Sequence, residues 1–591
     1  MDMKLISKRF LWPLLIAGLA MLFFLPALRG GFLHWDDHAL YVENPYYTSL
    51  SSEHWKWMCT TFRYGHWQPL TWLTCALDYK IWKLNAFSWH LTNLLIHAVN
   101  AVLVYRLCLT FAGRIRPARS EIYVPAALAA LFWAIHPLRV ETAVWLATRG
   151  YLLCTLFCLL TVLFYLRATE QNRYPFAALL CFALATFTKG IGMMLPPVLL
   201  LLDWVPLRRI YSIRTAFFCA LEKIPFFAFS LVTGVTAFLA KRADGGMAPV
   251  EIYGPVQRIG QAVYGIWFYL FKTVSPQNLS PLYEKHPDFW QVLAALFLSA
   301  AAGIFLFLFR KRLFAASFGL CPATAGSLSL SSGPIFGTFG AFLLLIFPML
   351  GITQSGSQMF ADRFTYLAAV PFSILLSAGL VRLRPMRRTV FGALAALLLI
   401  FGAQSAVYSN VWKNGLSLWS YAVAADASQS GAQNNLGIVL IERNDYEKAL
   451  GCFDKALAMR PEYADALNNR ALIKVQQGDY EGAISDLNTA LAQELMRVND
   501  RAKMRILRGL ALENMHDSNA AIADYSAVIE NPEVDPACRL KALQARAHLW
   551  LVAGHIDAAR MDLEAMLVLP DISGAFHCRA RTALEAFSEP R

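Results

Sequence analysis

Acidic side chains stand beside apolar stretches at two places in the sequence. Asp36 and Asp37 follow an apolar run near the N-terminus, and Glu141 comes soon after His136 and Pro137. Adjacent acids at a membrane surface can hold a cation or remove a proton from a hydroxyl group, although acids are also common in solvated loops. Glu141 opens a predicted helix, where the helix dipole favours a negative charge, so a purely structural role is the alternative for this acid.

Four cationic side chains accompany these acids near predicted membrane boundaries, namely Lys189, Arg258, Arg363 and Arg149. We expect the first three to converge on one membrane face, where they could clamp a phosphate, because a guanidinium group matches phosphate oxygens well. Lipid headgroup binding or snorkelling is the alternative for each cation taken alone. Arg149 is predicted inside an apolar helix and needs a partner. Glu141, eight residues earlier, is expected to face a similar side.

Imidazole and phenol side chains complete the set of pocket candidates, which are His66, His90, His136, Tyr264 and Tyr366. Zinc would need further ligands in matching geometry, so the sequence predicts no metal site, and a divalent metal is compatible with the pocket without being required. Two of the 11 cysteines, Cys59 and Cys75, share a predicted outer loop. Their spacing alone does not show whether they form a disulfide.

Apolar segments fill the first part of the chain and must position these residues. Of the 591 residues 57% are hydrophobic, and the mean hydropathy is +0.43, whereas a soluble domain is about 45–50% apolar. The apolar excess stops near residue 409. A membrane span needs about 20 apolar residues. The sequence predicts eleven spans, near 10–28, 90–110, 121–138, 142–166, 174–190, 191–206, 215–239, 290–309, 336–352, 364–382 and 388–408.

Basic residues between these segments predict their orientation. Lys and Arg cluster before the first span and in loops near 106–119, 167–173, 208–214, 310–312 and 382–388, and such loops stay in the cytoplasm. The loops alternate correctly if the apolar segment at 264–274 lies in the interface or re-enters the membrane. Residues 29–89, 241–289 and 409–591 then face outward. Because these loops account for the net charge of +13, we expect no nucleic-acid partner.

A repeat with a period of 34 residues follows the apolar part of the chain. Asp445 and Tyr446 recur as Asp479 and Tyr480, as in tetratricopeptide repeats (TPRs). Two weaker repeats with four-residue insertions come after them. The predicted fold is therefore all-α: a polytopic membrane helix bundle over 1–409, a linker helix over 410–429 and a TPR α-solenoid of about four repeats over 430–591. Such solenoids usually present a concave surface to a peptide or protein.

Taken in order, the polar motifs resemble those of the transmembrane-and-TPR-containing proteins, in particular their bacterial relatives. No single marker is decisive, but the ordered set is specific and runs through nearly the whole chain. The markers are Trp35-Asp36-Asp37, Gln68-Pro69-Leu70-Thr71-Trp72-Leu73, His90-Leu91-Thr92-Asn93 with His97, His136-Pro137 with Val140-Glu141 and Arg149, Thr188-Lys189 with Pro196 and Asp203, Ala361-Asp362-Arg363 with Tyr366, then Trp412 and the repeats.

This resemblance implies a GT-C glycosyltransferase fold in a bacterial inner (cytoplasmic) membrane. Such enzymes take a sugar from a polyprenyl-phosphate carrier and pass it to an acceptor on the outer face, and the animal members are similar to protein O-mannosyltransferases. Carried over, Asp37 or Asp36 would be the catalytic base and Glu141 would assist at the acceptor or sugar. The carrier phosphate would be bound by Lys189, Arg258 and Arg363, with Arg149 as a further candidate. The solenoid would handle a protein acceptor outside the cytoplasm.

Two departures and one rival interpretation accompany this resemblance. Many bacterial relatives have an acid where this chain has Tyr151, and Gly190-Ile191-Gly192 differs from the usual residues after the lysine. Both differences bear on the donor and on activity. The rival is a non-catalytic, membrane-anchored TPR scaffold for envelope assembly or secretion. A pure anchor would not need acids and cations gathered on one side, which favours the enzyme.

Overall fold

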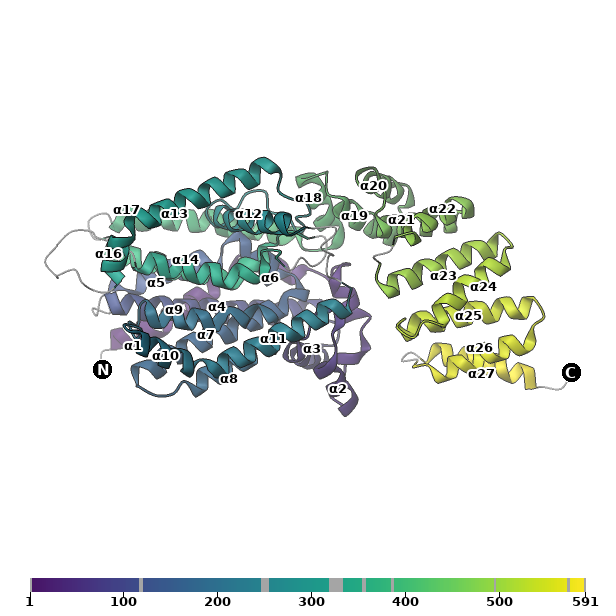
Figure 1. Cartoon of the computed structure of the whole chain (residues 1–591), viewed down its shortest axis with the longest axis horizontal. Helices are drawn as coiled ribbons and strands as arrows, with labels where there is room; N and C mark the ends of the chain where they lie inside the picture. The colour runs from purple at the N-terminus through teal and green to yellow at the C-terminus, as the bar shows by residue number, and fades with distance from the viewer. Residues whose placement is uncertain are drawn as a thin grey trace. The chain divides into compact units, whose positions relative to one another are not determined.

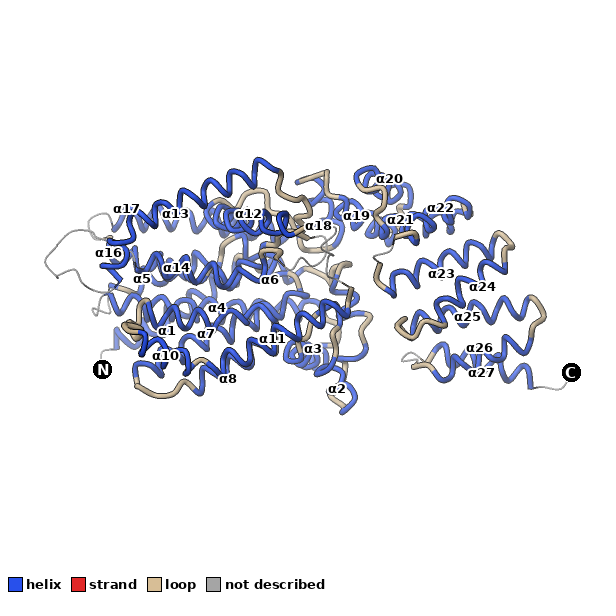
Figure 2. The backbone as a smooth tube through the Cα atoms, viewed as in Figure 1, coloured by secondary structure: helices blue, strands red, loops and turns tan. Residues whose placement is uncertain are grey.

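The chain folds almost entirely into helices. The structure is a computed structural model, and it describes all residues except 1–2, 116–120, 246–253, 318–332, 353–357, 384–386, 494–495, 571–573 and 589–591. Among the residues it describes, extended pairing is limited to one bridge between Tyr283 and Phe360. The chain divides into two compact units, Met1–Ala425 and Asp426–Arg591, and helices dominate both (Figure 2).

The first unit is a bundle of long apolar helices that run side by side (Figure 1). These are α1 Met3–Leu22, α4 Ala86–Ile115, α5 Tyr123–Ala134, α7 Arg149–Glu170, α8 Phe176–Thr186, α9 Leu195–Trp204, α11 Ile224–Ala243, α13 Phe289–Ser317, α14 Gly333–Ile346, α16 Val370–Arg382 and α17 Arg387–Val411. Shorter or interrupting helices are α2 Ser52–Thr60, α3 Pro69–Trp82, α6 Val140–Val144, α10 Ile213–Glu222, α12 Pro255–Val274, α15 Thr365–Ala368 and α18 Gly415–Ala425. In Figure 1, α2 and α3 gather at one end of this bundle and α10 at the other.

Apolar helices occur where the sequence predicts membrane spans. By length and composition, four described helices can each cross a membrane, and the number rises to six if each of two bent helix pairs is one span. Five shorter apolar helices occupy the remaining predicted positions. The prediction of an all-α membrane bundle followed by a helical-repeat region is thereby confirmed. The amphipathic segment at 255–274 forms the separate helix α12.

The chain bends sharply between α5 and α6, the short helix that contains Glu141. Helix α5 ends at Ala134, and the pair formed with Pro137–Val144 is bent by 57°, because Pro137 cannot continue the hydrogen-bond ladder of α5. The His136 side chain caps the new turn by accepting from the Leu138 amide at 3.2 Å. A second break follows at Trp145, whose backbone is extended with φ −72° and ψ 126°. Arg149 therefore begins helix α7 instead of lying inside it.

The second unit is a solenoid of paired helices. The pairs are α19 Ser430–Glu442 with α20 Tyr446–Met459, α21 Ala464–Gln477 with α22 Tyr480–Leu491, α23 Val498–Asn514 with α24 Ser518–Ile529, and α25 Pro536–Val552 with α26 Ile556–Val568, followed by α27 Ala575–Ser588. Where the two helices of a pair cross, only a small residue fits against the aromatic ring of the partner helix. A Cβ atom on Gly437 would lie 2.6 Å from Phe453, and one on Gly509 would lie 2.6 Å from Tyr525.

An arginine–aspartate ladder runs through the last three repeats. Arg470, Arg508 and Arg546 each hold, with two nitrogens at 2.6–2.9 Å, the aspartate sixteen residues later in the paired helix. The third nitrogen of each arginine reaches the preceding repeat, at Asp454 (2.7 Å), Asn488 (2.7 Å) and Ser526 (2.6 Å) in turn. One side chain thus ties together its own helix pair and the neighbouring repeat.

Candidate active site

Asp37 fastens the first outer loop to the start of α7. Its side chain is fully buried, and its two oxygens accept hydrogen bonds from the amides of Leu33 at 3.0 Å and Ala147 at 2.9 Å. Burial raises the pKa of Asp37 from 3.8 to about 8, although these two bonds oppose the shift. With both oxygens occupied by backbone, Asp37 holds the loop in register with residues 145–147.

The neighbouring Trp35 and Asp36 take different positions. The Trp35 ring stacks on Trp145, with centroids 4.3 Å apart and planes at 10°, and the Arg363 guanidinium lies 5.4 Å from the centroid of Trp145. Asp36 is half-buried, and its negative charge acts on Lys189. The Trp35 stack therefore brings the Asp36 carboxylate to the cations of the site, while Asp37 turns away into the loop.

Glu141 and Arg363 form the ionic centre of the site although 222 residues separate them in sequence. The fully buried Glu141 carboxylate accepts from the backbone amide of Arg363 at 2.8 Å and forms an ion pair with its guanidinium. A second guanidinium nitrogen of Arg363 donates to Gln358 Oε1 at 2.8 Å. A carboxylate held at both the main chain and the side chain of one arginine fixes the direction in which that guanidinium points.

Lys189 sits in the turn between α8 and α9, outside both apolar helices. Two contacts from the first outer loop fix this turn: the Leu70 amide donates to the Phe187 carbonyl at 3.0 Å, and the Thr71 hydroxyl donates to the Thr188 carbonyl at 2.9 Å. Helix α7 also approaches closely, because a Cβ atom on Gly150 would lie 3.1 Å from the Thr188 carbonyl oxygen. The two motifs that contain Leu70 and Lys189 thus form one structural unit.

The charges around Lys189 disfavour its protonated form. The side chain is 8% exposed, and burial together with the nearby charges of Lys241 and Arg363 lowers the pKa of Lys189 from 10.5 to about 7. Burial and the charges of Lys189, Lys241 and Arg363 hold the pKa of His66 well below its usual range. His66, Lys189, Lys241 and Arg363 therefore lie within electrostatic reach of one another, together with the acids Asp36, Glu141 and Asp244.

Two side chains of this region were not singled out as site residues from the sequence. Lys241 lies in the last turn of α11, where a lysine looks like an ordinary membrane-boundary residue. Tyr151 was noted only as a departure from the relatives, yet its ring lies 5.2 Å from the Lys189 ammonium, and its hydroxyl interacts with Arg363. The contact of Tyr151 with both Lys189 and Arg363 can be recognised only once the fold is known.

The expected pairing of Arg149 with Glu141 is wrong. The Arg149 guanidinium is buried and forms an ion pair with Asp78 at 2.6 Å, and it also donates to Asn93 Oδ1 at 2.9 Å and to the Trp89 carbonyl at 3.1 Å. The eight-residue spacing assumed one continuous helix, whereas the extended Trp145 separates the two residues. Cys75, also beside Arg149, and Cys59 are unpaired thiols.

The remaining predicted residues lie around this centre or away from it. Arg258 occupies the first turn of α12 and donates to the Ile352 carbonyl at 3.1 Å. His136 contacts the Thr273 carbonyl at 3.0 Å, and Tyr264 packs on Phe360 from the same helix.

The last two predicted residues, His90 and Tyr366, belong to the packed interior. His90 contacts the Gly31 carbonyl at 3.4 Å, and the Tyr366 hydroxyl contacts His97 at 2.7 Å. In the described part of the chain, the histidines, cysteines and acids form no group of three that could hold a metal ion.

A helical membrane unit with a buried acid–arginine pair at one end, followed by a repeat solenoid, defines the class of this protein. The family model described as "Tetratricopeptide repeat" matches residues 436–505. A protein named Protein O-mannosyl-transferase F38B6.6 from Caenorhabditis elegans is 24% identical over 72% of this chain and 59% of its own length. About three quarters of the chain is thus related in sequence to a protein with that name.

Two human proteins give shorter matches. Protein O-mannosyl-transferase TMTC3 is 29% identical over 22% of this chain and 14% of its own length, and Protein O-mannosyl-transferase TMTC1 is 29% identical over 27% and 18%. The chain spans about three-fifths of the worm protein and less of the human ones. Among solved structures, the crystal structure of the yeast Tom70 covers 81% of this chain and 95% of its own, with 13% identity and a TM-score of 0.22.

Proposed function

We propose that this chain is a membrane glycosyltransferase of the GT-C type, which transfers a sugar from a polyprenyl-phosphate-linked donor to a protein acceptor outside the cytoplasm. The named activity of the relatives supports the transfer of a sugar to protein. The observation that carries the proposal is the gathering of three cations, Lys189, Lys241 and Arg363, in a region that also holds Asp36. Such a region attracts a phosphate, and the adjacent carboxylate can accept a proton.

Within this proposal Asp36 is the general base and Asp37 positions it. Both Asp37 oxygens accept hydrogen bonds from backbone amides, whereas Asp36 is half-buried and its charge acts on Lys189. Asp36 takes the proton of the acceptor hydroxyl as its oxygen bonds to the sugar C1 atom. The C1–O bond to the phosphate breaks, and the carrier leaves as an anion. Because attack and departure occur on opposite faces, the anomeric configuration inverts.

The cations stabilise the departing phosphate in this mechanism. Arg363 is aimed by Glu141, so Glu141 acts through Arg363 and does not itself contact the acceptor. A phosphate that arrives adds a negative charge beside Lys189, whose buried ammonium is disfavoured by Lys241 and Arg363 and only partly compensated by Asp36. Fixed positive charges beside the negative leaving group lower the barrier, because the protein does not have to reorganise during the reaction. No step requires a metal ion, and Arg149 supports the site from behind through Asp78.

The remaining parts of the chain take supporting roles in the proposal. The polyprenyl tail lies among the apolar helices, and the TPR solenoid binds or orients the protein acceptor. The basic loops orient the bundle so that the site and the solenoid face away from the cytoplasm, in a bacterial inner membrane.

Substitution of the two central charges tests this proposal. We expect Asp36→Asn and Arg363→Ala each to lower the transfer rate by at least 100-fold in proteoliposomes supplied with lipid-linked sugar, with unchanged membrane insertion. Asp36→Asn should keep the melting temperature, whereas Arg363→Ala leaves the buried Glu141 without its partner and should lower it. Glu53→Gln, which changes an exposed acid of the same outer loop, is the matched control and should retain activity. Full activity of both site variants would contradict the assignment.

Asp37→Asn separates positioning from catalysis. An amide can accept one of the two backbone hydrogen bonds but places its NH2 group against the other donor, so stability should fall by about 1–3 kcal/mol.

The scaffold alternative is tested by comparing the envelope glycans of cells with and without the chain. An unchanged glycan profile together with loss of a TPR-bound complex would favour the scaffold.

A further inference from the structure

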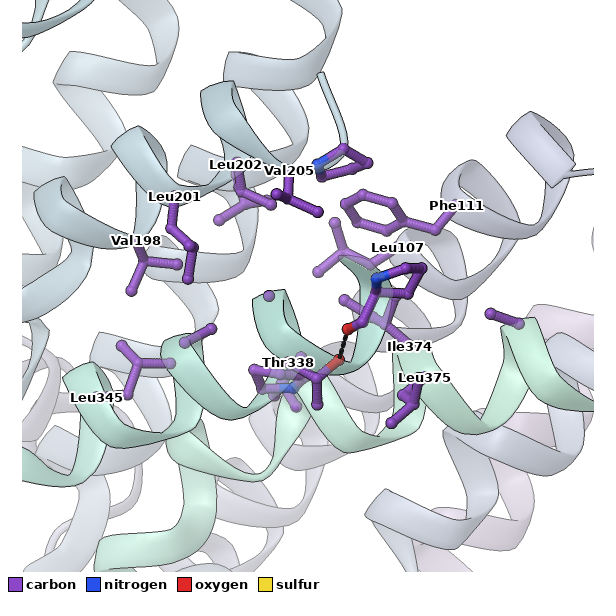
Figure 3. Close-up of a pocket in the computed structure, with 18 of the residues that line it drawn as sticks. Leu107, Phe111, Val198, Leu201, Leu202, Val205, Thr338, Leu345, Ile374 and Leu375 are labelled. Atoms are coloured by element: carbon purple, nitrogen blue, oxygen red, sulfur yellow. Dashed lines mark hydrogen bonds between the residues drawn. The ribbon is translucent and has the colours of Figure 1, made fainter. Parts of the chain in front are cut away.

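An apolar cavity of about 190 Å³ lies among α4, α7, α9, α14 and α16 (Figure 3). Side chains such as Leu107, Leu201 and Ile374 surround it. The hydroxyl of Thr338 donates to the Pro334 carbonyl of its own helix at 2.8 Å, so it offers the cavity no free polar group. Apolar cavities of this size stay dry and bind hydrocarbon, and an acyl chain is the hydrocarbon that a membrane supplies.

The dimensions of the cavity suit a chain from a single leaflet. Along α16 it is lined from Val370 to Arg382, a distance of about 18 Å at the rise of an α-helix. Half of the hydrocarbon core of a bilayer is about 15 Å thick. The length of the cavity therefore matches one leaflet, and its volume of about 190 Å³ accommodates part of one acyl chain while the headgroup stays at the membrane surface.

Two arginines stand at the end of the cavity that lies away from Asp36 and Arg363. Arg114 is in the last turn of α4 and Arg382 in the last turn of α16, and both line the cavity. Arg114 forms an ion pair with Glu170 at 2.8 Å. Arg382 uses one nitrogen in a long contact of 3.5 Å with the Ala378 carbonyl, and a guanidinium has five donor hydrogens. Among the described residues that line the cavity, Arg114 and Arg382 are cations and none is an acid.

We propose that the membrane unit binds one anionic phospholipid here, with an acyl chain in the cavity and the phosphate beside Arg114 and Arg382. Both arginines belong to loops predicted to face the cytoplasm, and basic pockets between membrane helices on that side bind anionic headgroups. The site is separate from the proposed donor site, because its cations lie at the opposite ends of the helices. It does not depend on the chain being a glycosyltransferase.

Native mass spectrometry of the detergent-purified full chain tests this inference. The chain is titrated with phosphatidylglycerol or with phosphatidylcholine of the same acyl chains. We expect one phosphatidylglycerol to bind at least tenfold more tightly than phosphatidylcholine. The double change Arg114→Gln with Arg382→Gln should remove this preference. Leu201→Trp, which fills the cavity, should weaken binding of both lipids at least tenfold, and Ala341→Leu is a milder filling variant should the first fail to fold.

Arg167→Gln is the matched control, because Arg167 is an exposed arginine on the same predicted side and does not line the cavity. Its lipid affinity should equal that of the unmodified chain. Equal binding of both lipids, or an unchanged affinity in the double arginine variant, would overturn the proposal. So would loss of phosphatidylglycerol on Lys189→Ala together with its displacement by polyprenyl phosphate, since the cavity would then hold the tail of the donor.

Discussion

At the scale of single residues, Lys189 links burial to ligand binding. Its ammonium is surrounded by protein and by the charges of Lys241 and Arg363, so its pKa is lowered to about 7. A bound phosphate would add a negative charge and raise that pKa again. The protein must then take up a proton on binding whenever the pH exceeds about 7.

Donor affinity should therefore depend on pH with a definite sign. A carrier phosphodiester keeps one negative charge throughout this range, so the titrating groups belong to the protein: Lys189, which would contact the phosphate, and Asp37, whose pKa is about 8. We expect the dissociation constant for lipid-linked sugar to be flat below pH 7 and to rise about tenfold per pH unit above it. Lys189→Arg should bind without this pH dependence, because arginine stays charged. A dissociation constant measured by fluorescence titration that stays constant up to pH 9 in the unmodified chain would contradict the assignment.

The sequence allowed the charged residues of the site to be found but not their partners. Asp36, Lys189 and Arg363 were recognisable because charges at membrane boundaries are costly. The Glu141–Arg363 pair was not, since 222 residues separate its members and only tertiary folding brings them together. Asp37 looked equivalent to Asp36, and its two backbone hydrogen bonds leave no trace in the sequence.

At the scale of helices, the break at Trp145 decides which charges meet. It detaches α6 from α7, so Glu141 pairs with Arg363, while Arg149 at the start of α7 meets Asp78 from α3. The sequence predicted the break at Pro137, because proline has a strict backbone requirement. It did not predict the break at Trp145, where an ordinary residue becomes extended through tertiary contacts.

The Arg149–Asp78 pair should behave as a buried ion pair. The side chains are 1% and 10% exposed, so Asp78→Asn leaves a buried charge unpaired and should cost about 3–5 kcal/mol of stability. The double change Asp78→Leu with Arg149→Met should recover most of that loss, because it removes both charges. Glu170→Gln, which breaks the exposed pair with Arg114, should cost at most about 1 kcal/mol. Denaturant unfolding in detergent measures all three, and a double variant that is no more stable than Asp78→Asn would contradict the pairing.

At the scale of the whole molecule, the division into two units follows composition. The apolar excess ends near residue 409, and the compact units meet at Ala425 and Asp426. The repeat period and the length of an apolar segment can both be read from neighbouring residues in the sequence. Helices, spans and repeats could therefore be predicted, whereas the contacts between helices inside the bundle could not. The candidate active site depends on contacts that involve α3, α6, α7 and the turn before α9.

Removal of residues 426–591 should separate chemistry from acceptor handling. If the solenoid raises the local concentration of a protein acceptor, the truncated chain should lose at least tenfold in kcat/KM toward that protein. Its rate with a short hydroxyl-bearing peptide should stay within about twofold, because the site lies wholly in the first unit. Steady-state kinetics with both acceptors makes the comparison, and equal losses for protein and peptide would contradict an acceptor-handling role.

The ladder of Arg470, Arg508 and Arg546 has a mechanical consequence for the solenoid. Because each guanidinium grips its own helix pair and the preceding repeat at once, tilting one repeat against the next also loosens the pairing within a repeat. Flexing at a single junction is then more costly than a small strain shared among all of them. The repeats should bend as one elastic rod, so that a load applied at one end is felt along its length.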